Sequence, residues 1–208
     1  MKEKNAHRLL PYLRPLTGVW YRAIQTRFIA TALHFSSTAS RFNPGGTFPL
    51  LYLSENHLVA LLEVQALFGS PLNASGLIPS PRHSYTVLNL TVNLAGVADL
   101  TSHKSQTDLE TNPQELTGDW IGYQIRSLLT SVRAVPGPAP TQQLGNEINT
   151  LADIEAFCTL SAKAPDQMNL VIYPDKLRPG SFIEFFNPTT GKTERLISDP
   201  LTGKAAIV

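Results

Sequence analysis

One charged residue, Glu63, interrupts an apolar stretch that extends from Leu58 to Phe68. As a helix, this stretch would carry apolar side chains on nearly every side, so Glu63 is expected in a largely buried setting. Ionising a carboxylate among apolar side chains costs several kcal/mol, so either a charged partner or a polar cleft must compensate it. A Glu that reaches solvent at a gap in the packing, or that pairs with an arginine for architecture alone, explains the residue as well as a functional cleft does.

Two arginines and a tyrosine are the other residues whose chemistry stands out. Arg22 and Arg41 follow or precede an aromatic neighbour, Tyr21 and Phe42, in segments that we expect to be strand or turn. Guanidinium groups grip phosphate oxygens with a planar fork that lysine lacks, so the pair could bind phosphate groups. Read singly, each arginine is better explained by a surface salt bridge. Tyr52 read alone is better explained as a core aromatic whose hydroxyl finds a partner.

The commonest motif-bearing enzyme classes are not indicated. The sequence contains no Walker-type phosphate loop, GxGxxG, HExxH or GxSxG. Its five histidines have no ligand spacing and Cys158 is the only cysteine, so we expect no metal site and no intramolecular disulfide. A lone cysteine suits a reducing compartment, which makes cytoplasm the expected location.

Charge and hydropathy narrow the range of partners. The 17 Lys and Arg residues almost balance the 16 Asp and Glu residues, giving a net charge of +1, so we expect no direct binding to nucleic acid or to a membrane surface. There is no signal-peptide core and no apolar run of about 18 residues, which predicts a soluble protein. At 208 residues, with 42% apolar residues, the chain can bury one sizeable core.

The strongest strand prediction is Tyr85–Leu94, where apolar and polar side chains alternate. Further strands are expected at Gly18–Ile24 and Thr47–Leu53, and in the blocks AFCTL, NLVIY, SFIEFF and ERLIS. A type II turn is predicted at NPGG, which begins at Asn43 and directly precedes the strand Thr47–Leu53.

Three helices are expected. The first runs from about Glu55 to Phe68 with Ser54 as its cap, the second lies within DWIGYQIRSLLTSV, and the third is capped by Thr141. A polar connection is predicted between Ala98 and Pro113, and the PGPAP run is predicted as a rigid loop. Because the helices and strands show no regular βαβ rhythm, the pattern favours an α+β fold over a doubly wound sheet.

Four blocks stand in an order and spacing that resemble the RES domain: YRAI, SRFNPGG, LYLSEN followed by ALLEV, and LSAKAPDQMNLVIYPD. The RES family is named for an arginine, a glutamate and a serine, and its members resemble ADP-ribosyltransferases in fold. The resemblance extends from about Tyr21 to Pro174. It implies a single α+β domain over residues 1–208, with a core of mixed or antiparallel sheets flanked by helices. The motif-bearing core would span about residues 18–175, with a C-terminal strand extension over residues 176–208.

The resemblance assigns particular residues. Arg41 matches the arginine of the family's "GRWNPxG" block, with Ser40 and Phe42 here in place of Gly and Trp. Tyr52 matches the tyrosine of the "LYxSE" block, and Glu63 matches the glutamate of "ALLE".

Three further positions follow from the other blocks. Ser161 matches the serine of the "PSA" block, where Leu160 stands in place of Pro. Arg22 matches the earlier "YR" position, and Asn169 matches the asparagine that precedes the late strand. Asn169 is therefore implied as part of the substrate-binding set.

Characterised members of this family are toxins that destroy cellular NAD and are neutralised by an Xre-like antitoxin. The resemblance implies that NAD is a consumed substrate and not a retained cofactor, and that its nicotinamide–ribose bond is cleaved by hydrolysis or phosphorolysis. Glu63 would stabilise the oxocarbenium-like ribose, with Arg41 and Ser161 completing the catalytic set. Arg22 and Arg41 would hold the pyrophosphate, Tyr52 would stack on the nicotinamide, and Ser161 would hydrogen-bond to the ribose or to Glu63.

Two alternative functions stay open at this point. One is transfer of ADP-ribose to a protein side chain, and the other is a catalytically idle module that binds a partner. The implied partners are NAD and an Xre-like antitoxin, and a homodimer within the toxin–antitoxin complex is compatible with the resemblance.

Overall fold

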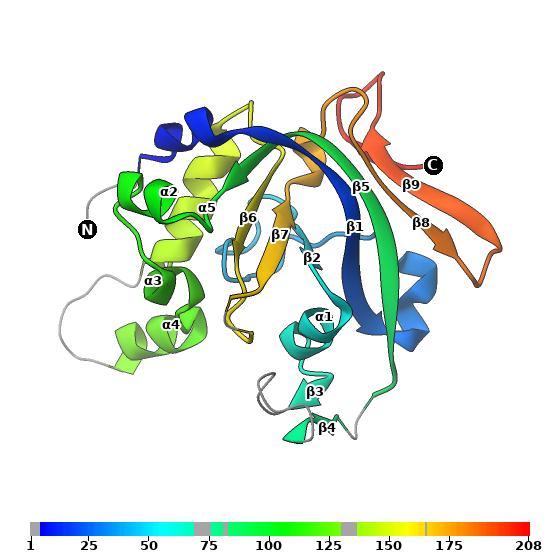
Figure 1. Ribbon diagram of the computed structural model, residues 1–208, viewed down its shortest axis with the longest axis horizontal. Coiled ribbons are helices and arrows are strands. Elements are labelled where there is room, and N and C mark those ends of the chain that lie inside the picture. The colour runs from blue at the N-terminus through cyan, green and yellow to red at the C-terminus, as the bar shows by residue number, and fades with distance from the viewer. Residues whose placement is uncertain (1–4, 69–75, 81–82, 130–136, 165) are drawn as a thin grey trace.

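An eight-stranded sheet organises the protein, and helices pack against it (Figure 1). The structure is a computed structural model that describes residues 5–68, 76–80, 83–129, 137–164 and 166–208. The strand order is β1-β2-β7-β6-β5-β8-β9-β10, and β1 also pairs with β5. The strands are β1 (Arg14–Gln25), β2 (Leu51–Ser54), β5 (Tyr85–Asp99), β6 (Ala156–Leu160), β7 (Met168–Ile172), β8 (Phe182–Asn187), β9 (Lys192–Ser198) and β10 (Ala205–Ile207).

The pairing of β1 with both β2 and β5 closes five strands, β1, β2, β7, β6 and β5, on one another. Neighbouring strands are antiparallel except β5 and β6, which are parallel. One apolar cluster lies among these strands and includes Trp20, Leu90 and Ile172. A mixed sheet with flanking helices confirms the predicted α+β class.

The helical elements lie between the strand groups. They are η1 (Ala6–Tyr12), η2 (Thr26–Thr31), α1 (His57–Glu63), α2 (His103–Asp108), α3 (Pro113–Thr117), α4 (Trp120–Leu129), α5 (Pro140–Thr150) and η4 (Pro174–Lys176). None of the helices in the described ranges is both long and apolar enough to span a membrane. The polar connection predicted between Ala98 and Pro113 contains α2, which is capped by the Ser102 hydroxyl.

Strand β5 follows the predicted alternation. Leu88, Leu90, Val92 and Leu94 are buried, whereas Thr91 is exposed. The strand continues five residues beyond the predicted end because residues 97–99 pair with β6 in parallel register. That pairing is a tertiary interaction, which alternation within one segment does not reveal.

Helix α1 is shorter than predicted and has a different cap. The Asn56 side chain accepts a hydrogen bond from the Val59 N–H at 3.0 Å, whereas Ser54 ends β2. At the other end, Gln65 adopts a left-handed φ of 58°, and the Ala66 N–H donates to the Leu61 carbonyl at 2.9 Å. This arrangement is a Schellman-type helix stop.

The residues after this stop form strand β3 (Leu67–Phe68), which pairs with β4 (Ile78–Pro79). The prediction of a helix through Phe68 was therefore wrong, since the chain reverses after Glu63.

Helix α5 holds the segment that carries Arg41. It begins at Pro140 with Ala139 as the capping position, so the predicted cap at Thr141 lies two residues too late. The Gln142 side-chain amide donates to the carbonyl oxygens of Ser40 at 2.9 Å and Asn43 at 3.2 Å. At Gly145, an added Cβ would lie 1.9 Å from the Phe42 carbonyl oxygen, so only glycine permits this close approach.

The remaining predictions are mostly confirmed. The predicted blocks overlap with β1, β6, β7, β8 and β9, although β1 begins four residues before the predicted Gly18, and the second predicted helix contains α4. The predicted strand Thr47–Leu53 begins only at Leu51. Part of the PGPAP loop lies outside the described residues, and positions 137–139 precede α5 without helical structure.

Candidate active site

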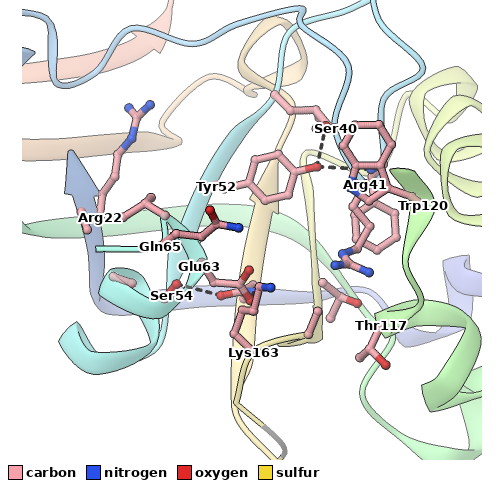
Figure 2. Close-up of a pocket in the computed structure, with 18 of the residues that line it drawn as sticks. Arg22, Ser40, Arg41, Tyr52, Ser54, Glu63, Gln65, Thr117, Trp120 and Lys163 are labelled. Carbon is pink, nitrogen blue, oxygen red and sulfur yellow. Dashed lines mark hydrogen bonds between the residues drawn. The ribbon is translucent and has the colours of Figure 1, made fainter. Parts of the chain in front are cut away.

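A cavity of about 740 Å³ lies between α1, the inner ends of β1 and β2, the segment at residues 36–42 and the start of α4 (Figure 2). Its volume is in the range typical of small-molecule sites. The lining includes five of the six residues predicted from the sequence: Arg22, Arg41, Tyr52, Glu63 and Asn169. Residues from the first 64 positions and from the segment after β6 therefore meet at one site.

Glu63 is the last residue of α1 and lies half-buried at the cavity wall. Its Oε1 accepts hydrogen bonds from the Ser161 hydroxyl at 2.6 Å and from the Asn169 amide at 2.7 Å. In the described part of the chain, no side chain or backbone group donates to Oε2. One carboxylate oxygen is thus fixed by the protein, and the other is available to a ligand.

Both donors to Glu63 are themselves held in place. The Ser161 hydroxyl accepts from the backbone N–H groups of Lys163 and Ala164 at 3.2 and 3.1 Å. The side-chain amide oxygen Oδ1 of Asn169 accepts from the Ser54 hydroxyl at 2.7 Å, and Ser54 and Asn169 face each other in the β2–β7 register. The network fixes the orientation of the carboxylate through the ends of three strands, β2, β6 and β7.

Ser161 stands behind Glu63 and does not line the cavity. Its side chain is 3% exposed, and its hydroxyl proton is directed to the carboxylate. Of the two partners considered for this serine, ribose or Glu63, the structure contains the contact with Glu63. In this geometry, Ser161 acts on a ligand only through the carboxylate that it positions.

The surroundings of Glu63 are more polar than the sequence predicted. Helix α1 buries Val59, Ala60 and Leu62, but Glu63 points to the cavity and its charge is met by neutral donors. No arginine or lysine among the described residues forms an ion pair with it. The described residues therefore do not contain the ion pair with an arginine that would give Glu63 a purely structural role.

Arg41 lies on the opposite wall beside Trp120 (Figure 2). Its guanidinium donates to the carbonyl oxygens of Gly118 at 2.5 Å and Leu116 at 3.4 Å. Burial lowers the pKa of Arg41, and the negative charge of Glu63 partly opposes that effect. A cation and a carboxylate thus face the same space without touching.

Tyr52 contributes a fixed aromatic ring between these two walls. Its hydroxyl is within 2.9 Å of the Ser40 hydroxyl and accepts the Phe42 N–H at 3.3 Å. Burial raises the pKa of Tyr52 to about 12, so the phenol stays neutral at physiological pH. Because the hydroxyl is hydrogen-bonded to Ser40 and Phe42, on either side of Arg41, the ring is the part of Tyr52 that can contact a ligand.

Arg22 does not share the position of Arg41. Its guanidinium donates to the carbonyl oxygen of Ala32 and, at 3.1 Å, to that of His34. In Figure 2 it lies on the far side of Gln65 from Arg41. Burial lowers the pKa of Arg22 to about 10, which still leaves the group protonated at neutral pH. The two cations therefore mark different parts of the cavity.

Several lining residues carried no signal in the sequence. Trp120 lines the cavity, but it lies in a predicted helix and its neighbours in the sequence did not indicate a site. The Thr159 hydroxyl is buried and has no hydrogen-bond partner among the residues described. Gln65 has a left-handed backbone that usually favours Gly or Asn, and strain of this kind concentrates at functional sites.

Comparisons with known proteins identify the family of this chain and a solved structure of similar fold. The RES domain family model matches residues 19–183, and the chain belongs to that family. No curated protein matches the chain significantly. A chain in the crystal structure of the M. tuberculosis MbcT-MbcA toxin-antitoxin complex is similar in fold, with a TM-score of 0.56 and 18% sequence identity over 86% of this chain and 87% of that chain.

Proposed function

We propose that this protein is the toxin of a toxin–antitoxin pair and that it cleaves the bond between nicotinamide and ribose in NAD. The observation that carries the proposal is the state of Glu63 at the wall of a cavity that also holds two guanidinium groups: its Oε1 is anchored, and its Oε2 receives no hydrogen bond from the described residues. Membership of the RES family supports this substrate, and the similarity in fold to a chain of a toxin-antitoxin complex supports the role as a toxin.

The chemistry needs only one carboxylate at the reacting carbon. In NAD the nicotinamide nitrogen is cationic, so the bond to C1′ of the ribose breaks with both electrons going to nitrogen, and neutral nicotinamide leaves. Positive charge then develops on the ribose, and the free Oε2 of Glu63 is suited to stabilise it. No general acid is required because the leaving group takes up no proton.

The second half of the reaction consumes water or phosphate. Water adds to C1′ and releases one proton, giving ADP-ribose, or phosphate adds to give ADP-ribose phosphate. Asp119 also lines the cavity, but its Oδ1 accepts the Gly122 N–H at 3.0 Å at the start of α4. Glu63 is therefore our choice for the group that also orients the incoming nucleophile.

The other residues bind and position. The ring of Tyr52 stacks on the nicotinamide, Arg41 binds a phosphate group, and Asn169 and Ser161 fix the Glu63 carboxylate. NAD is consumed as substrate, and no retained cofactor is proposed. We also assign the chain to the ADP-ribosyltransferase type of fold. We propose residues 1–208 as one unit because β8 pairs with β5, and the sheet continues from β8 through β9 to β10.

The partner that restrains such a toxin is an antitoxin, and we propose an Xre-like one. The similarity in fold to a chain of the MbcT-MbcA complex supports an antitoxin partner. A cytoplasmic location gives the protein access to NAD. A homodimer within the assembled complex is part of the same proposal.

Expression in a host that lacks the antitoxin should lower cellular NAD and stop growth, because a common metabolite is destroyed without restraint. The measurement is NAD content per cell together with the growth curve after induction, and the Glu63→Gln variant at the same soluble level is the control. Normal growth with unchanged NAD, at confirmed soluble expression, would count against the toxin assignment.

A further inference from the structure

A second cavity, of about 410 Å³, adjoins the first and shares part of its wall. The residues common to both are Arg22, Ala23, Ile24, Ser36 and Val64. The second cavity lies at the far end of the β1–β5 pair, where Gln25 and Tyr85 face each other in register. Arg22 therefore stands at the junction of two adjoining spaces.

Among the residues that the structure describes, no carboxylate pairs with the charge at this junction. Arg22 is half-buried, and in the described ranges its guanidinium donates to two backbone carbonyl groups, those of Ala32 and His34. Carbonyl oxygens carry only partial charge, so a half-buried guanidinium that meets only carbonyl groups favours the binding of an anion. A diphosphate has the charge and the oxygen geometry for this position.

The second cavity has the lining expected for a flat aromatic group. Phe28, Phe35 and Tyr85 contribute to its wall. Phe28 is 48% exposed although it is a large apolar side chain, and the Arg27 guanidinium lies 4.7 Å from the centroid of its ring. Aromatic rings of this kind provide stacking surfaces for a nucleobase.

Gln25 adds a polar group to the wall of the second cavity. Its amide oxygen Oε1 is buried and accepts no hydrogen bond among the described residues. A buried acceptor without a donor is unfavourable, so a ligand that supplies an N–H group would gain by binding there. Glutamine amides pair with the amino group and ring nitrogen of adenine in nucleic-acid recognition, and the same pairing is available to a free adenine nucleotide.

We infer that the second cavity holds the adenosine half of NAD, with Arg22 on the pyrophosphate at the junction and the Gln25 amide oxygen accepting a hydrogen bond from the adenine amino group. This inference rests on the proposed function and assigns separate tasks to the two arginines. Arg41 serves the nicotinamide end beside Tyr52 and Glu63, whereas Arg22 serves the middle of the dinucleotide.

The test compares substrates that differ only in the base. Nicotinamide hypoxanthine dinucleotide has a carbonyl oxygen where NAD has the adenine amino group. The unmodified protein should cleave NAD with a kcat/KM roughly threefold to tenfold higher, the value of one neutral hydrogen bond. Gln25→Leu should bring this ratio close to one, whereas the matched change Gln114→Leu, at an exposed position on α3, should leave it unchanged.

A third substrate separates the adenosine half from the reacting half. Nicotinamide mononucleotide lacks the adenosine and the second phosphate, so Phe28→Ala should lower kcat/KM for NAD about tenfold while leaving that for the mononucleotide unchanged. An unchanged base preference in Gln25→Leu would overturn the assignment. Loss of the preference in Trp120→Ala instead would do the same, because it would place the base beside Arg41.

Direct binding keeps this test separate from the proposed function. ADP and inosine diphosphate are titrated into the same preparations by calorimetry. A preference for ADP that Gln25→Leu abolishes would support the adenosine compartment even in a protein that leaves NAD intact, and the proposed function alone would then fail. NAD cleavage without any base preference would leave the proposed function standing and remove the compartment. Failure to bind either diphosphate, together with intact NAD, would contradict both.

Discussion

Replacing Glu63 with Gln should lower kcat for NAD cleavage about a hundredfold or more, with little change in KM. The amide keeps an oxygen that can accept from Ser161 and Asn169, so the side chain should stay in place. In the proposed mechanism, what is lost is the negative charge that Oε2 would present to the developing oxocarbenium ion. Loss of one preorganised electrostatic contact of this kind costs about 3 kcal/mol or more in the barrier.

The same variant should keep or slightly raise the melting temperature. No cationic partner is left unpaired among the described residues, and a neutral amide is less costly to desolvate than a carboxylate. NAD turnover and thermal melting are measured on one preparation. A destabilised variant with wild-type turnover would contradict the catalytic role and point to a structural one.

Replacing Arg41 with Ala should raise KM for NAD by roughly tenfold to a hundredfold, the value of a charged hydrogen bond of about 1.5–3 kcal/mol. Its guanidinium lies across the cavity from Glu63 and carries a positive charge suited to a phosphate group. Arg41→Lys should recover part of the loss, because lysine keeps the charge but not the fork. The measurement is steady-state kinetics over a range of NAD concentrations.

The control for this prediction is Arg14→Ala. Arg14 is an exposed arginine on β1 that pairs with Asp99 at 3.1 Å and does not line either cavity. Surface pairs contribute little to stability, so its removal should leave both KM and melting nearly unchanged. If the Arg41→Ala and Arg14→Ala variants had the same KM, Arg41 would only stabilise the connection between α3 and α4 and would not bind NAD.

Much of the sheet could be predicted because its strands are encoded locally. Strand β5 alternates buried and exposed side chains over most of its length, and periodicity alone identifies it. Glu63 could be singled out because a charge in an apolar stretch is physically unexpected. Its neighbours in space, Ser161 and Asn169, lie about a hundred residues later and were assigned only through the resemblance to a family.

What could not be predicted from the sequence depends on contacts between residues that are far apart in the chain. Ser54 was predicted to cap α1, but its hydroxyl donates to Asn169 on the neighbouring strand, and Asn56 takes over as the cap. Arg22 and Arg41 look equivalent in sequence, yet the carbonyl groups that receive their hydrogen bonds lie in different segments and separate them. Contacts of this kind depend on the assembled sheet and leave no local pattern.

The most direct test of the central claim is to incubate the purified protein with NAD and to identify every product by NMR and mass spectrometry, with and without phosphate. The account predicts that one free nicotinamide appears for each NAD lost, together with ADP-ribose in the absence of phosphate or ADP-ribose phosphate in its presence. NAD that stays intact beside a protein with a cooperative melting transition would contradict the account. Nicotinamide release with the ADP-ribose found only on a protein side chain would replace cleavage with transfer.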